Sequence, residues 1–458
     1  MLTYELKKSP GVPLYEALYR NIRTDILSGK LAADAKLPSK RALAEHLEVS
    51  KITVETAYNQ LLEEGYIRSA EKVGYFVEPI IQQRPAAEDT PRQEEPTPAD
   101  TGAGPERFPF SVWSRLQREV VLDYGEKLLL PLQNQGSFEL RRAIADHLAE
   151  FRGMNVDPGN ILVGAGTDFL YNLLIQLLGR DKTYAVEEPG YDKIRKIYAA
   201  GGVACVSAEM DNLGVVPESL KTAQVLHISP AHHFPTGIVT PVSRRQELLR
   251  WAAGQDGYII EDDYDSEFRF DAHPMPTMMS LDGSGRVVYM NTFSKSLAPS
   301  IRISYMVLPE GLMRQFREKL GFYSCTVSSF EQYTLARFLS RGHFEKHINR
   351  MRRFYRRRRN QIMELLGKSS FAPLLQVREE DAGLHFLVKV ATDLSDEALV
   401  ERCRAAGLSL RTLGSYYHTT PPADVAHTLV INYATLREED ITAALQKLAD
   451  GDAPEGNS

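Results

Sequence analysis

The first 78 residues carry apolar side chains at the spacing of three amphipathic helices followed by a hairpin. The first helix is predicted over residues 13–28, before Gly29, with an apolar face formed by Leu14, Ala17, Leu18, Ile22, Ile26 and Leu27. Ser39 is the expected N-cap of a second helix, and Ser50 is the expected N-cap of a third. The inward residues of these two helices are Leu43, Ala44, Leu47, Val54, Ala57 and Leu61. The alternation over residues 65–77 then predicts a β-hairpin with Lys72, Val73 and Gly74 at its tip.

Three helices with a tight turn between the last two, followed by a hairpin, are typical of a winged helix-turn-helix. The third helix of this fold enters the major groove of DNA, where hydroxyl groups and cations reach base edges and phosphates. The residues expected at this interface are Ser39, Lys40, Arg41, Ser50, Lys51, Thr53, Thr56, Lys72 and Gly74. The block holds eleven Lys and Arg against eleven Asp and Glu, so a dimerisation module with a solvated polar face is the alternative.

Residues 79–107 differ sharply in composition from the rest of the chain. They are rich in Pro, Glu, Asp, Thr and Ala, and they contain no large apolar residue after Ile81. Such a segment buries too little surface to offset the entropy of ordering it, which predicts a flexible linker. An ordered arm lying on a neighbouring molecule is the alternative. The expected domains are therefore residues 1–78, the linker 79–107 and a body over residues 108–450.

The body alternates strand-like and helix-like stretches from about Phe108, which predicts an α/β domain. A strand over residues 161–166 runs directly into a helix, and a phosphate binds well at such a helix N-terminus. A strand over residues 257–268 ends in a cluster of acids. A metal site is not expected there, because neither His nor Cys lies at ligand spacing.

A third buried strand, starting at Val287, leads to Lys295, and Arg302 follows seven residues later. A lysine after a buried strand is usually only a surface residue. A lysine flanked by hydroxyl groups, with an arginine nearby, suits an aldehyde cofactor that carries a phosphate. The lysine would form a Schiff base, and the hydroxyls and the arginine would neutralise the phosphate.

Composition narrows the class of protein further. The 458 residues have a net charge of −6 and are 43% hydrophobic, as in a soluble globular protein. No stretch approaches the roughly 20 apolar residues of a membrane span, and the first residues lack a signal-peptide core. Cys205, Cys325 and Cys403 are far apart and odd in number, so they form no disulfide framework. We therefore expect a cytoplasmic protein without membrane contact.

The sequence LPSKRALAEHLEVSKITVETAYNQLLEEGYIRSAEKVGYFV, residues 37–77, resembles the signature of the GntR superfamily of bacterial regulators. Residues 108–448 resemble fold-type I enzymes that depend on pyridoxal phosphate (PLP), the aspartate aminotransferase group. That resemblance implies a mostly parallel sheet with helices on both faces and a smaller C-terminal α+β subdomain.

The second resemblance also implies roles for individual residues. Lys295 would carry the PLP Schiff base, Asp262 would pair with the pyridine nitrogen, and Tyr264 would donate to the phenolic oxygen. Tyr191 would stack on the ring, and the loop HHFPTG, residues 232–237, would lie beside the ring hydroxyl. The cofactor-binding residues that the resemblance implies are Gly166, Thr167, Tyr191, His233, Asp262, Tyr264, Thr292, Ser294, Lys295 and Arg302.

A GntR-like N-terminal block followed by an aminotransferase-like body is similar to the MocR/GabR family of regulators. The resemblance implies a homodimer, head to tail and domain-swapped, that binds operator DNA. It also implies that an amine effector forms an external aldimine with PLP and so alters DNA binding, without turnover except for residual half-transamination. Two alternatives stay open: a regulator that senses PLP itself and controls cofactor synthesis, and a working aminotransferase.

Three features of the sequence depart from the family pattern or are ambiguous. Thr435 stands where aminotransferases carry the arginine that holds the substrate carboxylate, and Arg437 follows two residues later. Lys193 stands where GabR-like members have a second such arginine, so Lys193 and Arg302 are the predicted effector contacts. The run RMRRFYRRRR, residues 350–359, is interpreted either as a solvated helix face or as a second, non-specific DNA contact.

Overall fold

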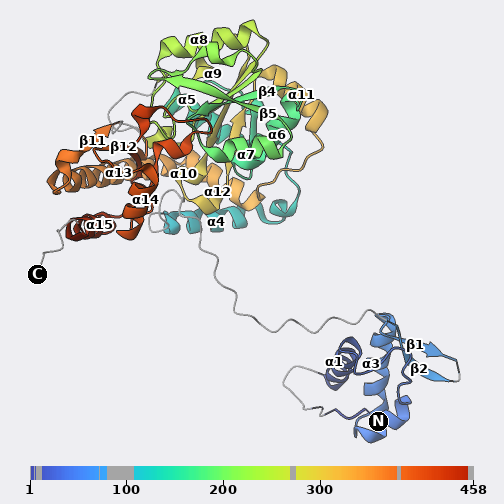
Figure 1. Ribbon diagram of the computed structural model, residues 1–458. Coiled ribbons are helices and arrows are strands. Elements are labelled where there is room, and N and C mark those ends of the chain that lie inside the picture. Colours follow the sequence, from blue (N-terminus) through green and yellow to red (C-terminus); the bar gives the residue numbers. More distant parts are fainter. Residues whose placement is uncertain are drawn as a thin grey trace, which may run out of the picture. The chain divides into compact units, whose positions relative to one another are not determined.

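The computed structural model describes residues 2–4, 6, 13–71, 73–79, 108–268, 275–378 and 383–451, with side chains up to residue 447. The chain divides into two compact units, Met1–Thr97 and Pro98–Ser458 (Figure 1). The predicted linker, apart from Pro79, lies outside the described residues, and so does Lys72.

The N-terminal unit has the three helices and the hairpin that the apolar spacing predicts. Its elements are α1 (Leu14–Leu27), α2 (Lys40–His46), α3 (Lys51–Glu63), β1 (Ile67–Ala70) and β2 (Gly74–Val77). The two strands pair antiparallel, and Lys36 bridges to Phe76 at the edge of the hairpin. The unit has its own core, whose fully buried members include Leu18, Ile22, Leu43, Val54, Ala57 and Leu61. The prediction of a winged helix-turn-helix is confirmed at the level of these elements.

The body is built on an eight-stranded sheet with the order β3-β10-β9-β8-β7-β4-β5-β6. The strands are β3 (Ile161–Gly164), β4 (Thr183–Glu188), β5 (Ala204–Asp211), β6 (Gly214–Val215), β7 (Val225–Ile228), β8 (Tyr258–Asp262), β9 (Val287–Thr292) and β10 (Ser304–Val307). The five strands β9, β8, β7, β4 and β5 run parallel. Strand β10 is antiparallel to both β9 and β3, and β6 is antiparallel to β5.

Helices cover both faces of this sheet, as expected for strands that are buried on both sides. One core lies under α6 (Thr167–Leu178), α7 (Asp192–Ala200) and α11 (Glu310–Leu320). On the opposite face, one core packs under α8 (Val242–Gly254) and α9 (Met278–Leu281), and another packs under α5 (Phe138–Arg152) and α12 (Ser329–Ser340) (Figure 1). The expectation of a fold-type I body is confirmed by this mostly parallel, doubly covered sheet.

The C-terminal part of the body forms a four-stranded antiparallel sheet with the order β11-β12-β14-β13. These strands are β11 (Leu375–Arg378), β12 (His385–Val390), β13 (Arg411–Thr412) and β14 (Thr428–Asn432). Three helices pack with them: α13 (His343–Lys368), α14 (Asp396–Ala405) and α15 (Glu438–Gly451). Two remaining helices, α4 (Phe110–Tyr124) and α10 (Phe293–Ser296), complete the regular α-helical elements of the described body.

Within the described ranges, no helix is both long enough and apolar enough to cross a membrane. The arginine run lies on α13, where several of its members make internal contacts. Arg352 donates from Nε to the carbonyl oxygen of Glu267 at 2.5 Å, and Arg358 donates to the carbonyl oxygens of Tyr433 and Ala434 at 3.4 and 3.2 Å. Much of this charge therefore serves the packing of the body.

Candidate functional site

A cavity opens where the carboxyl ends of the parallel strands meet, which is where open α/β sheets bind ligands. Asp262 ends β8 at the wall of this cavity, and Thr292 ends β9 beside it. The predicted site residues that line the cavity are Thr167, Tyr191, Asp262, Tyr264, Thr292 and Lys295. The structure thus brings together six residues from four separate segments of the chain.

Lys295 is presented by the short helix α10, which starts directly after β9. The Thr292 hydroxyl caps this helix by accepting a hydrogen bond from the Ser294 backbone N–H at 3.1 Å, and it also accepts one from Ser304 at 2.7 Å. The Ser294 Oγ is buried and has no hydrogen-bond partner among the described residues. The local sequence therefore fixes the backbone on which the Lys295 amine is carried.

The turn between β3 and α6 forms the predicted phosphate end of the site. Gly166 is the N-cap of α6 with a φ of 89°, and its α-carbon packs against the guanidinium of Arg302. A β-carbon at this position would overlap that guanidinium and force it to move, and the positive φ strains any residue other than glycine. Thr167 begins the helix, whose free N–H groups and positive dipole end suit an anion.

The ring-stacking residue and the HHFPTG loop meet at the mouth of the cavity. Tyr191 is 40% exposed and packs edge-to-face against Phe234, with ring centroids 6.1 Å apart. Phe234 lines the cavity. His233 does not: its Nδ1 lies 2.7 Å from the Thr236 Oγ1, and its Nε2 lies 3.5 Å from Glu187. Burial, followed by the neighbouring His232, lowers the pKa of His233 to about 3.

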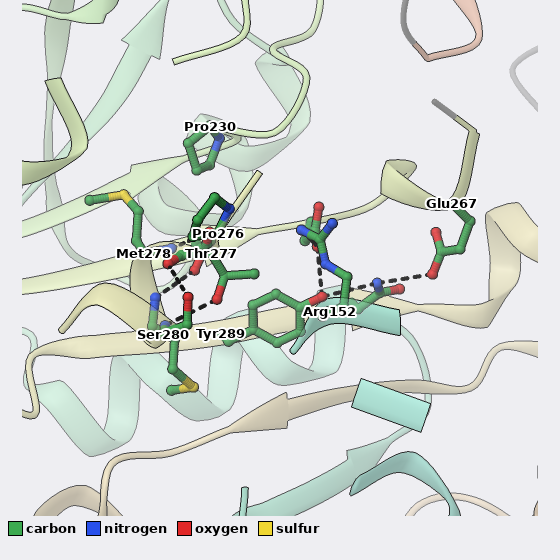
Figure 2. Close-up of polar contacts among 12 residues, drawn as sticks. Arg152, Pro230, Glu267, Pro276, Thr277, Met278, Ser280 and Tyr289 are labelled. Atoms are coloured by element: carbon green, nitrogen blue, oxygen red, sulfur yellow. Dashed lines mark hydrogen bonds and ion pairs between the residues drawn. The ribbon is translucent and has the colours of Figure 1, made fainter. Parts of the chain in front are cut away.

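The acidic cluster after β8 divides between the two faces of the sheet, because side chains alternate along a strand. Asp262 faces the cavity, while Glu261 and Asp263 face the opposite side. Asp263 accepts from Arg152 at 2.7 Å and from the Tyr289 hydroxyl at 2.6 Å, and Figure 2 shows Arg152 and Tyr289 in this network. Glu261 accepts from the backbone N–H groups of Met278 and Met279 at the start of α9. The second face thus holds the end of β8 in place.

A second carboxyl group, Glu187 at the end of β4, also lines the cavity. It accepts a hydrogen bond from the Ser229 backbone N–H at 2.9 Å. Burial raises its pKa to about 8, and the neighbouring Asp262 adds to this shift, although the Ser229 hydrogen bond opposes it. Glu187 is therefore mostly neutral near pH 7, and it can both donate and accept hydrogen bonds.

The cavity fits PLP, judged by polar atoms of the lining residues Asp262 and Tyr264 and by one of Ser294, which neighbours Lys295 but is not itself a lining residue. Asp262 Oδ1, the Tyr264 hydroxyl and the Ser294 hydroxyl are buried without a hydrogen-bond partner in the described part of the chain. These groups match a protonated ring nitrogen, a phenolic oxygen and a phosphate. Burial raises the pKa of Tyr264 well above 10, so its hydroxyl keeps its proton and can donate. The Lys295 amine in the same cavity supplies the partner for an aldehyde.

The predicted effector contacts lie elsewhere. Lys193 Nζ is 2.7 Å from Asp168 Oδ2, and Arg302 Nη2 is 3.4 Å from the same oxygen, so both cations meet one carboxylate at the start of α6. Neither of them lines the cavity. Thr435 is exposed and donates to the Asn432 carbonyl oxygen, and Arg437 binds Asp440, while Asn432 and Ala434 line the cavity. Among the described residues that line the cavity, two carry a basic side chain: Lys295 and Arg195, which lies on α7.

Sequence reasoning missed several lining residues. Tyr171 lies one helical turn after Thr167 on α6, and His227 lies on β7; both reach Asp262. Phe234 lies inside the HHFPTG loop next to the predicted His233, and Glu187 lies four residues before the predicted Tyr191. His227 had a signal in the sequence, because it is the polar residue of the otherwise apolar strand VLHI, whereas Glu187 is one of two adjacent acids at the end of β4. The pairing with Asp262 has no signal in the sequence.

The predicted DNA-binding residues of the N-terminal unit divide into caps and exposed groups. The Ser39 hydroxyl accepts from the Ala42 N–H at 3.2 Å, and the Ser50 hydroxyl accepts from the Thr53 N–H at 3.1 Å, so both serines cap helices. Lys40 pairs with Glu55 at 2.9 Å and ties α2 to α3. Besides the two capping serines, the exposed members of this set are Arg41 and Lys51 near the starts of α2 and α3, and Thr56 in the second turn of α3. Gly74 opens β2 with a φ of 130°.

Comparison with known proteins agrees with both units. The family model "Aminotransferase class I and II" matches residues 106–448, and "Bacterial regulatory proteins, gntR family" matches residues 14–77. The kynurenine aminotransferase of Pyrococcus horikoshii has a similar structure, with a TM-score of 0.66 at 25% identity, covering 78% of this chain and 90% of that one.

Two relatives match nearly the whole chain. The probable rhizopine catabolism regulatory protein MocR of Rhizobium meliloti is 31% identical, over 97% of this chain and 94% of its own. The pyridoxine biosynthesis transcriptional regulator PdxR of Corynebacterium glutamicum is 30% identical, over 94% of each chain. The chain belongs to the MocR/GabR family of HTH-type transcriptional regulators, in which a GntR winged helix-turn-helix is fused to an aminotransferase-like domain.

Proposed function

We propose that this regulator holds PLP on Lys295 and changes its binding to operator DNA when an amine effector enters the same cavity. PLP bound to a lysine supplies an electrophilic carbon that a second amine can attack. The observation that carries the proposal is the convergence of Lys295, Asp262 and Tyr264 on one cavity, with unpartnered polar atoms directed at it. Gly166 and Arg302 would receive the phosphate.

The experiment is an absorbance titration of the purified protein with candidate amines, beside a Lys295→Ala variant. We expect a band from lysine-bound PLP that the variant lacks and that one class of amine shifts. The same samples are then tested for DNA binding. A band that shifts without any change in DNA affinity would refute the coupling, and a protein that binds no PLP would refute the cofactor assignment.

A second candidate is a regulator that senses PLP itself. Two observations favour it: Thr435 replaces the arginine that holds a substrate carboxylate, and one relative is named a regulator of pyridoxine biosynthesis. DNA binding measured with apo-protein, with and without PLP and in the absence of any amine, separates the two. In this second case PLP alone changes the DNA affinity, and no amine changes it further.

We further propose that the body senses its ligand without turnover. Aminotransferases hold the substrate carboxylate through the reaction with an arginine, and this chain has Thr435 at that position. Steady-state assays with amino donors and 2-oxo acids test this, and sustained transamination would refute it.

The exposed apolar residues Phe110, Leu122, Leu129 and Leu130 support a homodimer through α4 and the turn after it. Light scattering measures whether the protein is a dimer. We also propose that the dimer is head to tail, with the N-terminal units exchanged between the two subunits.

For the N-terminal unit, we propose that Arg41, Lys51 and Thr56 contact operator DNA in the cytoplasm. Their exposure on α2 and on the first two turns of α3 supports this, since the recognition helix of this fold enters the major groove while the preceding helix crosses the DNA backbone. The assignment of Ser39, Lys40, Ser50, Thr53 and Gly74 to the interface stays a prediction, as does the effector role of Lys193 and Arg302.

A further inference from the structure

The carboxylate of Asp262 is part of a buried chain of four side chains that the cofactor assignment does not explain. The Tyr171 hydroxyl donates to Asp262 Oδ2, and the Nε2 of His227 lies 3.5 Å from the same oxygen. The Tyr198 hydroxyl lies 2.6 Å from His227 Nδ1. These groups come from α6, β7, α7 and the end of β8, and each residue is at most 5% exposed.

The chemistry of the chain fixes the direction of its hydrogen bonds. Burial, reinforced by nearby acidic groups, raises the pKa of Tyr171 and Tyr198 well above 10, so both phenols keep their protons and donate. If Tyr198 donates to Nδ1 of His227, the ring carries its proton on Nε2 and directs it at Asp262. The other tautomer would point a lone pair at the carboxylate, which electrostatics disfavours.

The result is a carboxylate with two unequal oxygens. Oδ2 faces both Tyr171 and His227, while Oδ1 is buried without a hydrogen-bond partner in the described part of the chain. The backbone beneath is held separately, because Arg152 and Tyr289 bind Asp263 on the opposite face of the sheet (Figure 2). The freedom that remains at Asp262 is rotation of its side chain, and donors on Oδ2 restrict that rotation.

We propose that Tyr171 and His227 are positioning residues that turn Asp262 Oδ1 toward the ring nitrogen of the cofactor, with Tyr198 orienting the His227 ring. This inference rests on the proposed binding of PLP in the cavity. It predicts that the two residues act through Asp262, not through contact with the cofactor alone or through general stability. Helix α7 carries Tyr198 one turn after Ile194 and Arg195, which line the cavity.

The test compares the PLP affinity of apo-protein for Tyr171→Phe, His227→Leu and the double variant. Loss of a hydrogen bond to a charged group weakens binding by about tenfold to a hundredfold, and we expect a change of this order for Tyr171→Phe. We expect a smaller loss for His227→Leu, because the Nε2 of His227 approaches Asp262 at 3.5 Å without forming a hydrogen bond. His227→Gln, which restores an N–H donor, should recover part of the loss. Tyr184→Phe is the matched control, because its buried hydroxyl donates to the Gly179 carbonyl oxygen and not to Asp262.

Two further readouts separate positioning from a merely structural role. In an Asp262→Asn background, Tyr171→Phe should have little additional effect on PLP affinity, since the residue acts through that carboxylate. The pH at which the absorption of bound PLP changes should also move in Tyr171→Phe and His227→Leu but not in Tyr184→Phe.

The outcomes distinguish this inference from the proposed function. If the wild-type protein binds no PLP, the cofactor assignment fails, and the inference fails with it. If the wild-type protein binds PLP, but Tyr171→Phe and His227→Leu match the Tyr184→Phe control in affinity and in pH dependence, only the positioning inference is overturned. Additive losses in the Asp262→Asn background would overturn it as well.

Discussion

Glu187 and Glu188 are neighbours at the end of β4, yet their pKa values move in opposite directions. Burial dominates at Glu187 and raises its pKa to about 8. Burial also acts at Glu188, but Thr419 and His418 donate three hydrogen bonds to its Oε1, at 2.7, 2.7 and 2.9 Å, and the net effect lowers its pKa. Glu187 therefore faces the cavity as a protonated carboxyl group, while Glu188 is a carboxylate that binds the loop containing His418 and Thr419.

This contrast predicts opposite pH effects on stability. Glu187 binds its proton more tightly in the folded state. Its contribution to the free energy of unfolding is therefore fully present below its unfolded pKa and is lost as the pH rises through about 8. Glu187→Gln should therefore flatten the decline in unfolding free energy between about pH 5 and pH 8, by at most about 1.4 kcal/mol per pH unit. Chemical denaturation at several pH values measures it.

Glu188→Gln is the opposite case and serves as the comparison. Because the pKa of Glu188 is lower in the folded state, its carboxylate stabilises the fold at pH values above its unfolded pKa. This stabilisation is lost as the pH falls through the pKa that Glu188 has in the folded protein. The variant should lose stability at neutral pH and approach the wild type in acid. If both variants show the same pH profile as the wild type, the assignment of these two protonation states is wrong.

Much of this organisation could be predicted from the sequence, because it depends on local pattern. Apolar spacing indicated the three helices of the N-terminal unit, and the resemblance placed Lys295 and Asp262 at strand ends that converge on the cavity. Partnerships across the sheet could not be predicted. Tyr171 lies 91 residues from Asp262, and nothing in local periodicity links them. The motif HHFPTG also did not reveal which ring faces the cavity, since the turn directs Phe234 inward and His233 away from it.

Gly166→Ala should abolish tight PLP binding. The new β-carbon would overlap the Arg302 guanidinium, and a φ of 89° costs a non-glycine residue about 1–2 kcal/mol on its own. The Arg302 guanidinium would have to move away from the turn where we propose that the phosphate binds, so we expect the affinity of apo-protein for PLP to fall by more than about tenfold.

Gly407→Ala separates strain from overlap in that experiment. Gly407 has a φ of 101°, and a β-carbon there would meet nothing within 4 Å. This variant should lose stability and keep its PLP affinity. Equal PLP affinities for the two variants would mean that the packing of Gly166 against Arg302 has no part in cofactor binding.

In the N-terminal unit, Ser50→Ala should change stability, whereas Thr56→Ala should change DNA binding. Ser50 caps α3 through the Thr53 N–H, so its loss should lower the stability of this unit by about 1 kcal/mol. Thr56 is exposed on the same helix, so its loss should leave stability unchanged and weaken DNA binding. Thermal unfolding and DNA titration on the same samples measure both effects. A Thr56→Ala variant with unchanged DNA affinity would remove Thr56 from the proposed interface.

The arginine run on α13 allows a comparison within one helix. Arg358 donates to the carbonyl oxygens of Tyr433 and Ala434, so Arg358→Ala leaves two acceptors poorly satisfied and should cost the body about 1–3 kcal/mol of stability. Arg353 is exposed, and Arg353→Ala should change stability by less than about 0.5 kcal/mol. We expect neither variant to change the dependence of DNA affinity on salt, because the contacts of Arg352 and Arg358 within the body favour a packing role for this helix. Each lost phosphate contact would reduce the slope of log affinity against log salt by about 0.9, and a reduction of that size in Arg353→Ala would show that the body also contacts DNA.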